Sequence, residues 1–362
     1  MSTSLVAAES TQSRWKPQVP NLSVILSFRN EQEVLVELIN RLRIVLGAEI
    51  AAGHLNEYEL IFVNDASTDN SENILQDAAK DHHDIRIITM SRRFGVSPCV
   101  LAGMEYSSGD LVVYMDADLQ DPPEVIAMML QTWREKDEVD VVHTQRESRA
   151  GESRIKLWIT ELGYRILREV SSIDLQIEVG DFKLLSRRAV NHLIQFKEVN
   201  PFLRGLVYWI GFTQVTIRYK RAARFAGETK VPIFSMKVIR NFFYSALISF
   251  SDIPLQLCAL IGLLTAGLAF VLLIYILLEK IQGYNLPGWT ALMTATLFLS
   301  GIQLLSVGIL GLYISAIFLE SKRRPNYIIR RKVGFPDQIE DASRQSEIKP
   351  SSLEEGGSGR VV

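Results

Sequence analysis

Three carboxylates follow one apolar run in the segment LVVYMDADLQDPPE, residues 111–124. Asp116, Asp118 and Asp121 come directly after the apolar residues, and two prolines follow them. Side chains alternate along an extended chain, so Asp116 and Asp118 point to the same side of it. Two carboxylates held that close repel each other, and one takes up a proton unless a cation lies between them. The pattern therefore indicates either a divalent-metal site or a solvated acidic turn.

A metal site of this kind has a natural ligand. Mg²⁺ commonly uses one or two carboxylates together with the phosphates of a substrate, so we expect a diphosphate ligand at Asp116 and Asp118. The chain contains neither a G-x-G-x-x-G nor a G-x-x-x-x-G-K-[S/T] segment. Phosphates would therefore be held by the metal and by basic side chains rather than by a glycine-rich loop.

The elements that must position these carboxylates alternate through residues 22–145. Strand patterns occur at LSVILSF, YELIFVND, IRIITM, DLVVYMD and VDVVHTQ, with helical patterns between them. This alternation predicts an α/β domain with a mostly parallel, doubly wound sheet. Such sheets bind ligands beyond the carboxyl ends of their strands. Polar residues follow four of those ends, in SFRNE, NDAS, DADLQD and TQRESR, so the acidic segment is expected at the ligand-binding edge.

Two long segments without charged residues follow this domain, at residues 253–278 and 289–319. Each exceeds the roughly 20 apolar residues that a membrane-spanning helix needs, although a pair of buried core helices is the alternative. Lysines and arginines flank the pair, and only Lys280 lies in the short link. The positive-inside rule then places the large domain and both termini in the cytoplasm. We expect a two-helix transmembrane hairpin.

Four motifs together resemble one enzyme family: VNDASTDNS, SGDLVVYMDADLQDPPE, GDFKLLSRR and GETK. Over about residues 21–330 the chain resembles the family 2 glycosyltransferases with a GT-A fold. More narrowly, it resembles the polyisoprenyl-phosphate glycosyltransferases of the GtrB or dolichyl-phosphate-mannose-synthase type. The resemblance implies a Rossmann-like GT-A sheet, a nucleotide-sugar donor, Mg²⁺ or Mn²⁺, and a polyprenyl phosphate acceptor of the undecaprenyl or dolichyl type.

The implied reaction is an inverting transfer of a sugar to that lipid at the cytoplasmic membrane face. Glucose from UDP-glucose is the expected sugar, and mannose from GDP-mannose, N-acetylglucosamine and aminoarabinose are the alternatives. A processive polysaccharide synthase is disfavoured because the chain lacks a Q-x-x-R-W segment. A non-catalytic nucleotide-binding membrane scaffold would be favoured by the loss of a key carboxylate, and all of them are present.

The resemblance also assigns roles to individual positions. The catalytic residues would be Asp118 and Asp181, the latter orienting a sugar hydroxyl or acting as a weak base, with orientation favoured. Donor binding falls to Ser27, Arg29, Glu31, Asp65, Asp116 and Asp118, and metal binding to Asp116, Asp118 and Gln120. Acceptor and phosphate binding falls to Arg146, Lys156, Arg224 and Lys230. Relatives usually have proline and tyrosine where this chain has Ser27 and Arg29.

The expected domain organisation has five parts. Residues 1–20 form a flexible N-terminus, 21–232 the cytoplasmic GT-A catalytic domain, 233–252 an amphipathic helix, 253–319 the hairpin, and 320–362 a basic and then disordered tail. The amphipathic helix would lie in the membrane surface, or else pack on the domain.

Partners follow from composition and from the spans. The formal net charge of −2 gives no basic footprint for nucleic acid. Glycines at positions such as Gly262 and Gly308 allow close helix contact, so a homo-oligomer is expected to be feasible. Two charge-free spans offer no polar path for a phosphosugar, so a separate flippase would act downstream.

Overall fold

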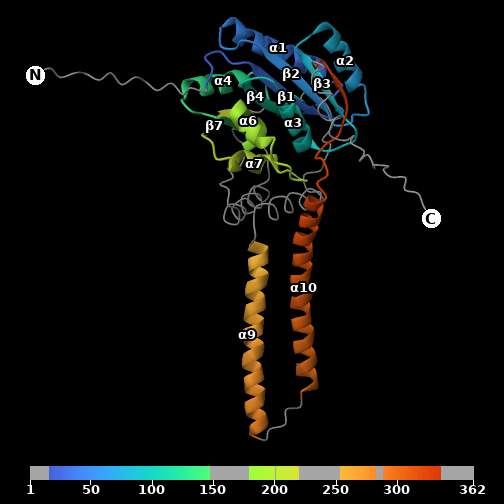
Figure 1. Ribbon diagram of the computed structural model, residues 1–362, viewed down its shortest axis with the longest axis vertical. Coiled ribbons are helices and arrows are strands. Elements are labelled where there is room, and N and C mark those ends of the chain that lie inside the picture. The colour runs from blue at the N-terminus through green and yellow to red at the C-terminus, as the bar shows by residue number, and fades with distance from the viewer. Residues whose placement is uncertain (1–15, 147–178, 200, 220–252, 283–287, 336–362) are drawn as a thin grey trace, which may run out of the picture.

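The computed structural model describes residues 16–146, 179–199, 201–219, 253–282 and 288–335. Within these residues the chain forms one mixed sheet with helices on both faces, and two long helices extend away from it (Figure 1). The predicted amphipathic helix over 233–252 lies outside the described residues, as do residues 1–15 and 336–362.

The sheet has eight strands in the order β7-β5-β6-β4-β1-β2-β3-β8. Their bounds are β1 Leu22–Phe28, β2 Tyr58–Asn64, β3 Ile85–Met90, β4 Leu111–Asp116, β5 Val141–Arg146, β6 Val179–Ser186, β7 Gln214–Tyr219 and β8 Ile329–Val333. The pairs β1–β2, β1–β4, β2–β3 and β5–β7 are parallel, whereas β6 and β8 run antiparallel to their neighbours. The prediction of a mostly parallel α/β sheet is confirmed, with two reversed strands that it did not include.

Helices cover both faces of the sheet, which explains why the central strands are largely apolar on both sides. One face carries α1 Leu35–Ala51, α2 Ser71–Asp81 and α4 Val125–Glu135, and the other carries α3 Val96–Glu105, α6 Arg187–Leu193 and α7 Leu203–Trp209. Every residue of β1 is buried, as expected for a strand covered on both sides. In α1, Leu35, Leu38 and Leu42 recur at helical spacing and enter the core.

A close approach of two backbones holds the start of β4 against β1. The N–H of Gly109 donates to Ser23 Oγ at 2.8 Å. A Cβ atom at Gly109 would lie 2.6 Å from the backbone nitrogen of Ser23, closer than real Cβ atoms come. Glycine is therefore required here for steric reasons, and the contact keeps β4 in register with the central strand.

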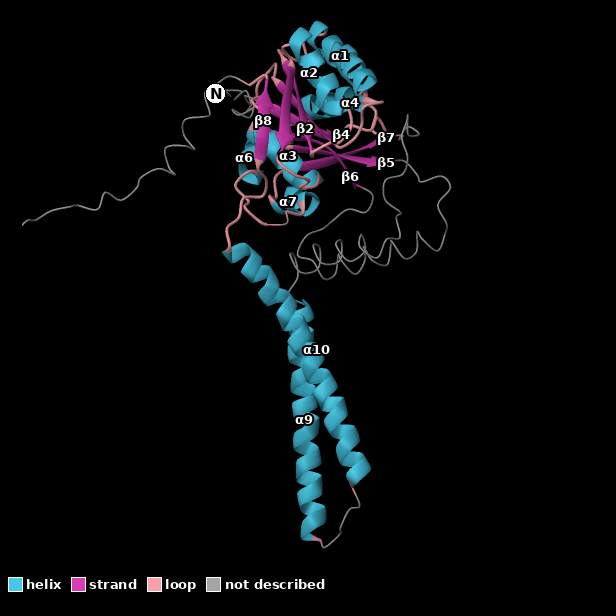
Figure 2. Cartoon of the chain, turned by 90° about the vertical axis from the view of Figure 1, so that its right-hand side faces the viewer, coloured by secondary structure: helices cyan, strands magenta, loops and turns pink. Residues whose placement is uncertain are grey.

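The two long helices are α9 Ile253–Ile281 and α10 Trp289–Ser321. Figures 1 and 2 show them side by side, directed away from the sheet domain. Within the described residues, the window Phe298–Ser321 of α10 is long and apolar enough to cross a membrane, and none of it is buried in the protein. The same criterion does not select α9, so the second membrane span stays a prediction.

Two contacts involve the ends of the described chain. The strand β8 lies within residues 320–362, the segment expected to be basic and then disordered, and it pairs antiparallel with β3 at one edge of the sheet. Arg331 Nη2 donates to Glu72 Oε1 at 2.7 Å and fixes the strand further. At the other end, Lys16 Nζ lies 4.3 Å from the centroid of the Trp133 ring, so a residue of the segment 1–20 contacts α4.

Candidate active site

Several residues with a strained backbone conformation lie at one edge of the sheet. Three non-glycine residues with left-handed backbone follow the carboxyl ends of β1, β2 and β4: Asn30 with φ 56°, Ala66 with φ 53° and Leu119 with φ 55°. Each such residue costs about 1–3 kcal/mol and is found most often at functional sites. The strain therefore indicates a site at the edge where the sequence places its polar residues.

The loops after β1 and β2 are joined by hydrogen bonds. The N–H of Asn30 donates to Ser67 Oγ at 3.0 Å, and the N–H of Thr68 donates to Asn30 Oδ1 at 2.8 Å. The N–H of Glu31 donates to Ser71 Oγ at 3.1 Å. These contacts fix the backbone of the SFRNE segment, and with it the donor-binding candidates Arg29 and Glu31.

Asp65, at the end of β2, organises the loop that follows β3. Its carboxylate accepts from the N–H of Phe94 at 2.6 Å and from the N–H of Gly95 at 3.0 Å. Gly95 has a φ of 99°, a conformation that favours glycine. In this structure both oxygens of Asp65 are thus engaged by the loop that leads into α3. The reading of a base by Asp65 stays a prediction.

The acidic segment forms a tight turn at the end of β4. Asp116 is the last residue of the strand and lies in register with Ser27 of β1, whose Oγ donates to Asp116 Oδ1 at 3.4 Å. The N–H of Gln120 donates to Asp118 Oδ1 at 3.1 Å, across the left-handed residue Leu119. Ser27, Asp116, Asp118 and Gln120 therefore lie together at the ligand-binding edge.

The third carboxylate of the segment has a different environment. Asp121 is 2% exposed and accepts a hydrogen bond from the hydroxyl of Tyr219, the last residue of β7. This contact ties the acidic turn to the outer strand of the sheet. Asp121 thus contributes to the fold and adds negative charge beneath the turn.

A reversed strand brings a fourth carboxylate to the same place. The antiparallel register of β4 and β6 pairs Tyr114 with Lys183, and its continuation sets Asp181 opposite Asp116. Burial, followed by the charges of Asp181, Asp118 and Asp121, raises the pKa of Asp116 to about 7, while Arg204 opposes the rise. The carboxylates of this cluster are too close together for all of them to ionise fully at neutral pH. A bound cation would favour their ionised forms.

Asp181 is paired with an arginine that we did not predict. Arg204 of α7 donates from Nε to Asp181 Oδ1 at 2.6 Å and from Nη2 to Asp181 Oδ2. This two-point arrangement is the strong form of a carboxylate–guanidinium contact. The segment PFLRGL gives no periodic signal that connects position 204 with position 181, so only the tertiary fold reveals the pair.

A buried lysine lies on the same face of β6. The Lys183 side chain is 0% exposed, and its Nζ has no hydrogen-bond partner within the described residues. Burial lowers the pKa of Lys183 to about 8, with Asp181 opposing this and Arg204 adding to it. Nζ lies 5.7 Å from the centroid of the Tyr208 ring. A cationic side chain is therefore held in the core beneath the carboxylates, a feature that the GDFKLL motif alone did not indicate.

Next to Lys183, a histidine is kept neutral. His143 of β5 is in register with Lys183, and its ring stacks on Tyr208 with centroids 4.5 Å apart. Burial and the charge of Lys183 lower the pKa of His143 to about 3, and its Nε2 is hydrogen-bonded to Gln214 Oε1 at 2.7 Å. His143 is therefore neutral at neutral pH, and its ring packs between β5 and α7.

The protein provides too few ligands to hold a hard divalent cation alone, so substrate phosphates and water would have to complete its coordination. Within the described residues no group of three or more histidines, cysteines and carboxylates is arranged to hold a metal. Asp116, Asp118 and Gln120 offer two carboxylates and an amide oxygen, which is the small oxygen set that Mg²⁺ completes with phosphates and water. The raised pKa of Asp116 agrees with such a role, because burial and the neighbouring carboxylates disfavour its ionised form and a bound cation would favour it.

Of the remaining predicted site residues, one is the last residue described before a gap, and three are not described. Arg146 ends β5, and its backbone pairs with Tyr219 of β7. Lys156, Arg224 and Lys230 lie outside the described residues. The structure thus gathers the acidic and donor-side candidates, whereas the basic acceptor-side candidates stay predictions.

Comparisons with known proteins identify the family of this chain. The family model described as "Glycosyl transferase family 2" matches residues 23–194. An uncharacterized glycosyltransferase of Bacillus subtilis is 38% identical over 87% of this chain and 95% of its own length. A prophage bactoprenol glucosyl transferase homolog of Escherichia coli K12 is 33% identical over 86% of this chain and 98% of its own. The bactoprenol glucosyl transferase of Shigella phage SfV is 32% identical over the same share of both chains.

Solved structures add only a distant likeness. A mannosyltransferase of Pyrobaculum calidifontis in complex with GDP-mannose and Mn²⁺ superposes with a TM-score of 0.43 and 16% identity, over 84% of this chain and 91% of that one. A likeness this weak carries no argument about chemistry, so the assignment depends on the sequence relatives and the matched domain. The sequence relatives and the matched domain confirm the resemblance to polyisoprenyl-phosphate glycosyltransferases. The chain belongs to glycosyltransferase family 2.

Proposed function

We propose that this protein transfers glucose from UDP-glucose to the phosphate of a polyprenyl phosphate, with inversion at the anomeric carbon. The observation that carries the proposal is the cluster of Asp116, Asp118 and Asp181, in which burial and crowding with the other carboxylates raise the pKa of Asp116 to about 7. Such a cluster suits a divalent cation that also holds a diphosphate. Relatives that are bactoprenol glucosyl transferases support the choice of acceptor and sugar, since they match over nearly their whole length.

The proposed chemistry needs little proton transfer. An oxygen of the acceptor phosphate forms the new bond to the anomeric carbon, and the bond from that carbon to the diphosphate breaks. The electron pair leaves with the nucleoside diphosphate. The second pKa of a phosphate monoester is about 6, so the nucleophile is largely ionised at cytoplasmic pH and no strong base is required.

The described residues divide the remaining work. Asp181 already accepts from two guanidinium N–H groups of Arg204, which suits orientation of a sugar hydroxyl better than removal of a proton. Asp116 and Asp118, with Gln120, would hold Mg²⁺ or Mn²⁺, which when bound supplies Lewis-acid stabilisation of the leaving diphosphate. Arg146, Lys156, Arg224 and Lys230 are proposed to offset the repulsion between the two phosphate-bearing substrates.

The membrane fixes where the reaction occurs. We propose that α9 and α10 both span the bilayer and leave the sheet domain and both termini in the cytoplasm, as the distribution of lysine and arginine predicts. Confining enzyme and lipid to one surface reduces the entropic cost of bringing them together. Homo-oligomerisation and a separate downstream flippase stay predictions from the sequence.

One experiment tests the reaction. Purified full-length protein in nonionic detergent would be given a short polyprenyl phosphate with UDP-glucose, UDP-N-acetylglucosamine, UDP-aminoarabinose or GDP-mannose, and Mg²⁺ or Mn²⁺. We expect the mass of a polyprenyl phosphoglucose from UDP-glucose alone. A product from another donor would replace glucose with that sugar, and no product from any donor would favour a nucleotide-binding scaffold.

A matched pair of variants ties the reaction to the acidic turn. Asp118→Asn is expected to lower turnover by at least about 100-fold, as removal of one electrostatic contact at a reacting group typically does. Asp137→Asn makes the same change at an exposed position after α4 and should leave turnover unchanged. Full activity of Asp118→Asn, or activity that survives excess chelator, would contradict the proposed metal role.

A further inference from the structure

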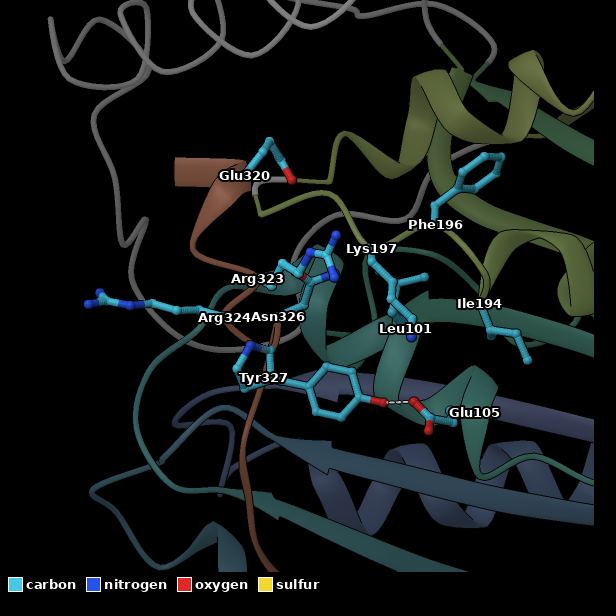
Figure 3. Close-up of a pocket in the computed structure, with 11 residues that line it drawn as sticks. Leu101, Glu105, Ile194, Phe196, Lys197, Glu320, Arg323, Arg324, Asn326 and Tyr327 are labelled. Atoms are coloured by element: carbon cyan, nitrogen blue, oxygen red, sulfur yellow. Dashed lines mark hydrogen bonds between the residues drawn. The ribbon is translucent and has the colours of Figure 1, made fainter. Parts of the chain in front are cut away.

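A cavity of about 720 Å³ lies where α10 meets the sheet domain. Its walls come from α3, from the segment after α6, and from the residues that follow α10 (Figure 3). Small-molecule sites in proteins commonly measure about 300–1,000 Å³, so this volume suits a ligand. The cavity shares no lining residue with the carboxylate cluster.

The cavity combines positive charge with an apolar wall. Lys197, Arg323 and Arg324 contribute the cations, and Leu101 contributes apolar surface together with Ile194 and Phe196. In Figure 3 the side chains of Arg323 and Lys197 lie between Glu320 and the Tyr327–Glu105 pair, whereas Arg324 points away from them. A ligand that fits would carry an anionic group next to a hydrocarbon portion.

The two carboxylates of the cavity accept hydrogen bonds from neutral groups. Glu320 Oε1 accepts from the N–H of Val199 at 2.8 Å, and Glu105 accepts from the hydroxyl of Tyr327. Within the described part of the chain, neither Arg323 nor Lys197 forms an ion pair. Arg323 and Lys197 therefore offer N–H donors to a bound anion, beside the two carboxylates.

The position of the cavity identifies the kind of anion. The window of α10 that is apolar enough to cross a membrane ends at Ser321, and Arg323 follows two residues later. Arg323 has a φ of 47°, which turns the chain away from the helix axis beside the cavity. Basic residues directly after a membrane helix lie at the level of the lipid headgroups.

The cavity and the acidic turn have different walls. The helix α3 begins at Val96, beside the loop held by Asp65, and ends at Glu105, toward the edge of the sheet opposite the carboxyl ends of the strands. The basic wall precedes β8, whose first residue, Ile329, pairs with Met90 at the carboxyl end of β3. The cavity therefore reaches toward the same edge as the acidic turn, and the two sites are distinguished by their lining residues.

We propose that this cavity binds the phosphate headgroup of an anionic phospholipid from the surrounding leaflet, with Arg323 and Lys197 on the phosphate and Leu101 against the acyl chains. The inference rests on the proposed membrane location of α10. A bound headgroup bridges the end of α10 to α3 and to the segment after α6. It therefore sets the orientation of the sheet domain relative to the membrane surface.

Native mass spectrometry of the full-length protein in nonionic detergent tests this site. Phosphatidylglycerol and phosphatidylcholine would be titrated separately, because a micelle without anionic lipid removes the general attraction of a charged leaflet. We expect one tightly held phosphatidylglycerol and weaker binding of phosphatidylcholine. Equal binding of the two lipids, or no bound lipid, would overturn the proposal.

Matched variants locate the site. Arg323→Gln and Lys197→Gln should each weaken phosphatidylglycerol binding about fivefold, which corresponds to about 1 kcal/mol per cation. Lys322→Gln is the control, because its Nζ lies 4.0 Å from the centroid of the Phe318 ring and it does not line the cavity. An equal loss in Lys322→Gln would indicate a diffuse charge effect and refute the site. Lys197 lies outside the turn after α10, so misfolding of Arg323→Gln would leave the test intact.

Two further outcomes separate this site from the proposed reaction. Displacement of phosphatidylglycerol by polyprenyl phosphate would assign the cavity to the acceptor and overturn the proposal. The lipid titration contains no sugar donor, so it can succeed when transfer fails, and the reverse also holds. Failure of sugar transfer together with retained phosphatidylglycerol binding would refute only the proposed function.

Discussion

The raised pKa of Asp116 leads to a stability test that requires no substrate. Its pKa is about 7 in the folded protein, against an ordinary value of 3.8, so the folded state binds this proton more tightly than the unfolded chain does. The contribution of this tighter proton binding to the free energy of unfolding is fully present below about pH 4. It is lost as the pH rises through about 7. Asparagine resembles the neutral carboxyl group and cannot ionise. Asp116→Asn should therefore melt above the wild type, and the difference should increase with pH.

The size of the effect follows from the shift. About three pKa units at about 1.36 kcal/mol each give about 4 kcal/mol above pH 7, and less than half of that at pH 5. For a domain of this size, 1 kcal/mol moves the melting temperature by about 2–4 °C. We expect the difference between Asp116→Asn and wild type to be about 5–10 °C larger at pH 8 than at pH 5.

The assay is thermal unfolding of the full-length protein in detergent with excess chelator, at pH 5 and pH 8. Asp137→Asn serves as the control, because it makes the same change at an exposed residue and should show no pH-dependent difference. If Asp116→Asn differed from the wild type equally at both pH values, or melted lower at pH 8, the electrostatic description of the cluster would be wrong.

Three other substitutions test separate parts of the structure. Arg204→Met removes the cation that lowers the pKa of Asp116, so the acid limb of the kcat/KM profile should move to higher pH; an unmoved limb would contradict this coupling. Lys183→Met replaces a buried side chain whose pKa is lowered to about 8, so it should raise the melting temperature at pH 7 by more than it does at pH 10, and equal changes at both pH values would refute the burial cost. Gly109→Ala should destabilise the fold by about 1–3 kcal/mol, because its Cβ would meet the backbone of β1. Gly47→Ala is its control, since no atom lies within 4 Å of the added methyl group, and an equal loss in both variants would show that the close approach is unimportant.

Local patterns were sufficient to predict the central sheet and the position of the acidic turn. The five strand patterns between residues 22 and 145 correspond to β1 through β5, because apolar runs flanked by helical periodicity depend only on neighbouring residues. The same alternation placed Asp116 and Asp118 at the carboxyl edge. There the structure finds Asp116 at the end of β4 and Asp118 in the turn that follows.

Features that depend on distant pairing could not be predicted in this way. The reversed direction of β6 determines that Asp181 meets Asp116, and α7 then supplies Arg204. Lys183 is charged in sequence but buried in the fold, since its register places it in the layer between the sheet and α7. The segment IRRKV looks like charge that flanks a membrane helix, and only its partner β3 shows that it is a strand.

The pairing of β8 with β3 has a consequence for biosynthesis. Arg331 and Glu72 are 259 positions apart, so this contact closes only after both long helices have been translated. Until then β3 presents an unpaired edge, and such edges promote aggregation of nascent chains. A nascent chain interrupted within α10 would contain all the described carboxylates of the acidic cluster and still lack a finished sheet. Completion of the sheet is thus linked to synthesis of both long helices.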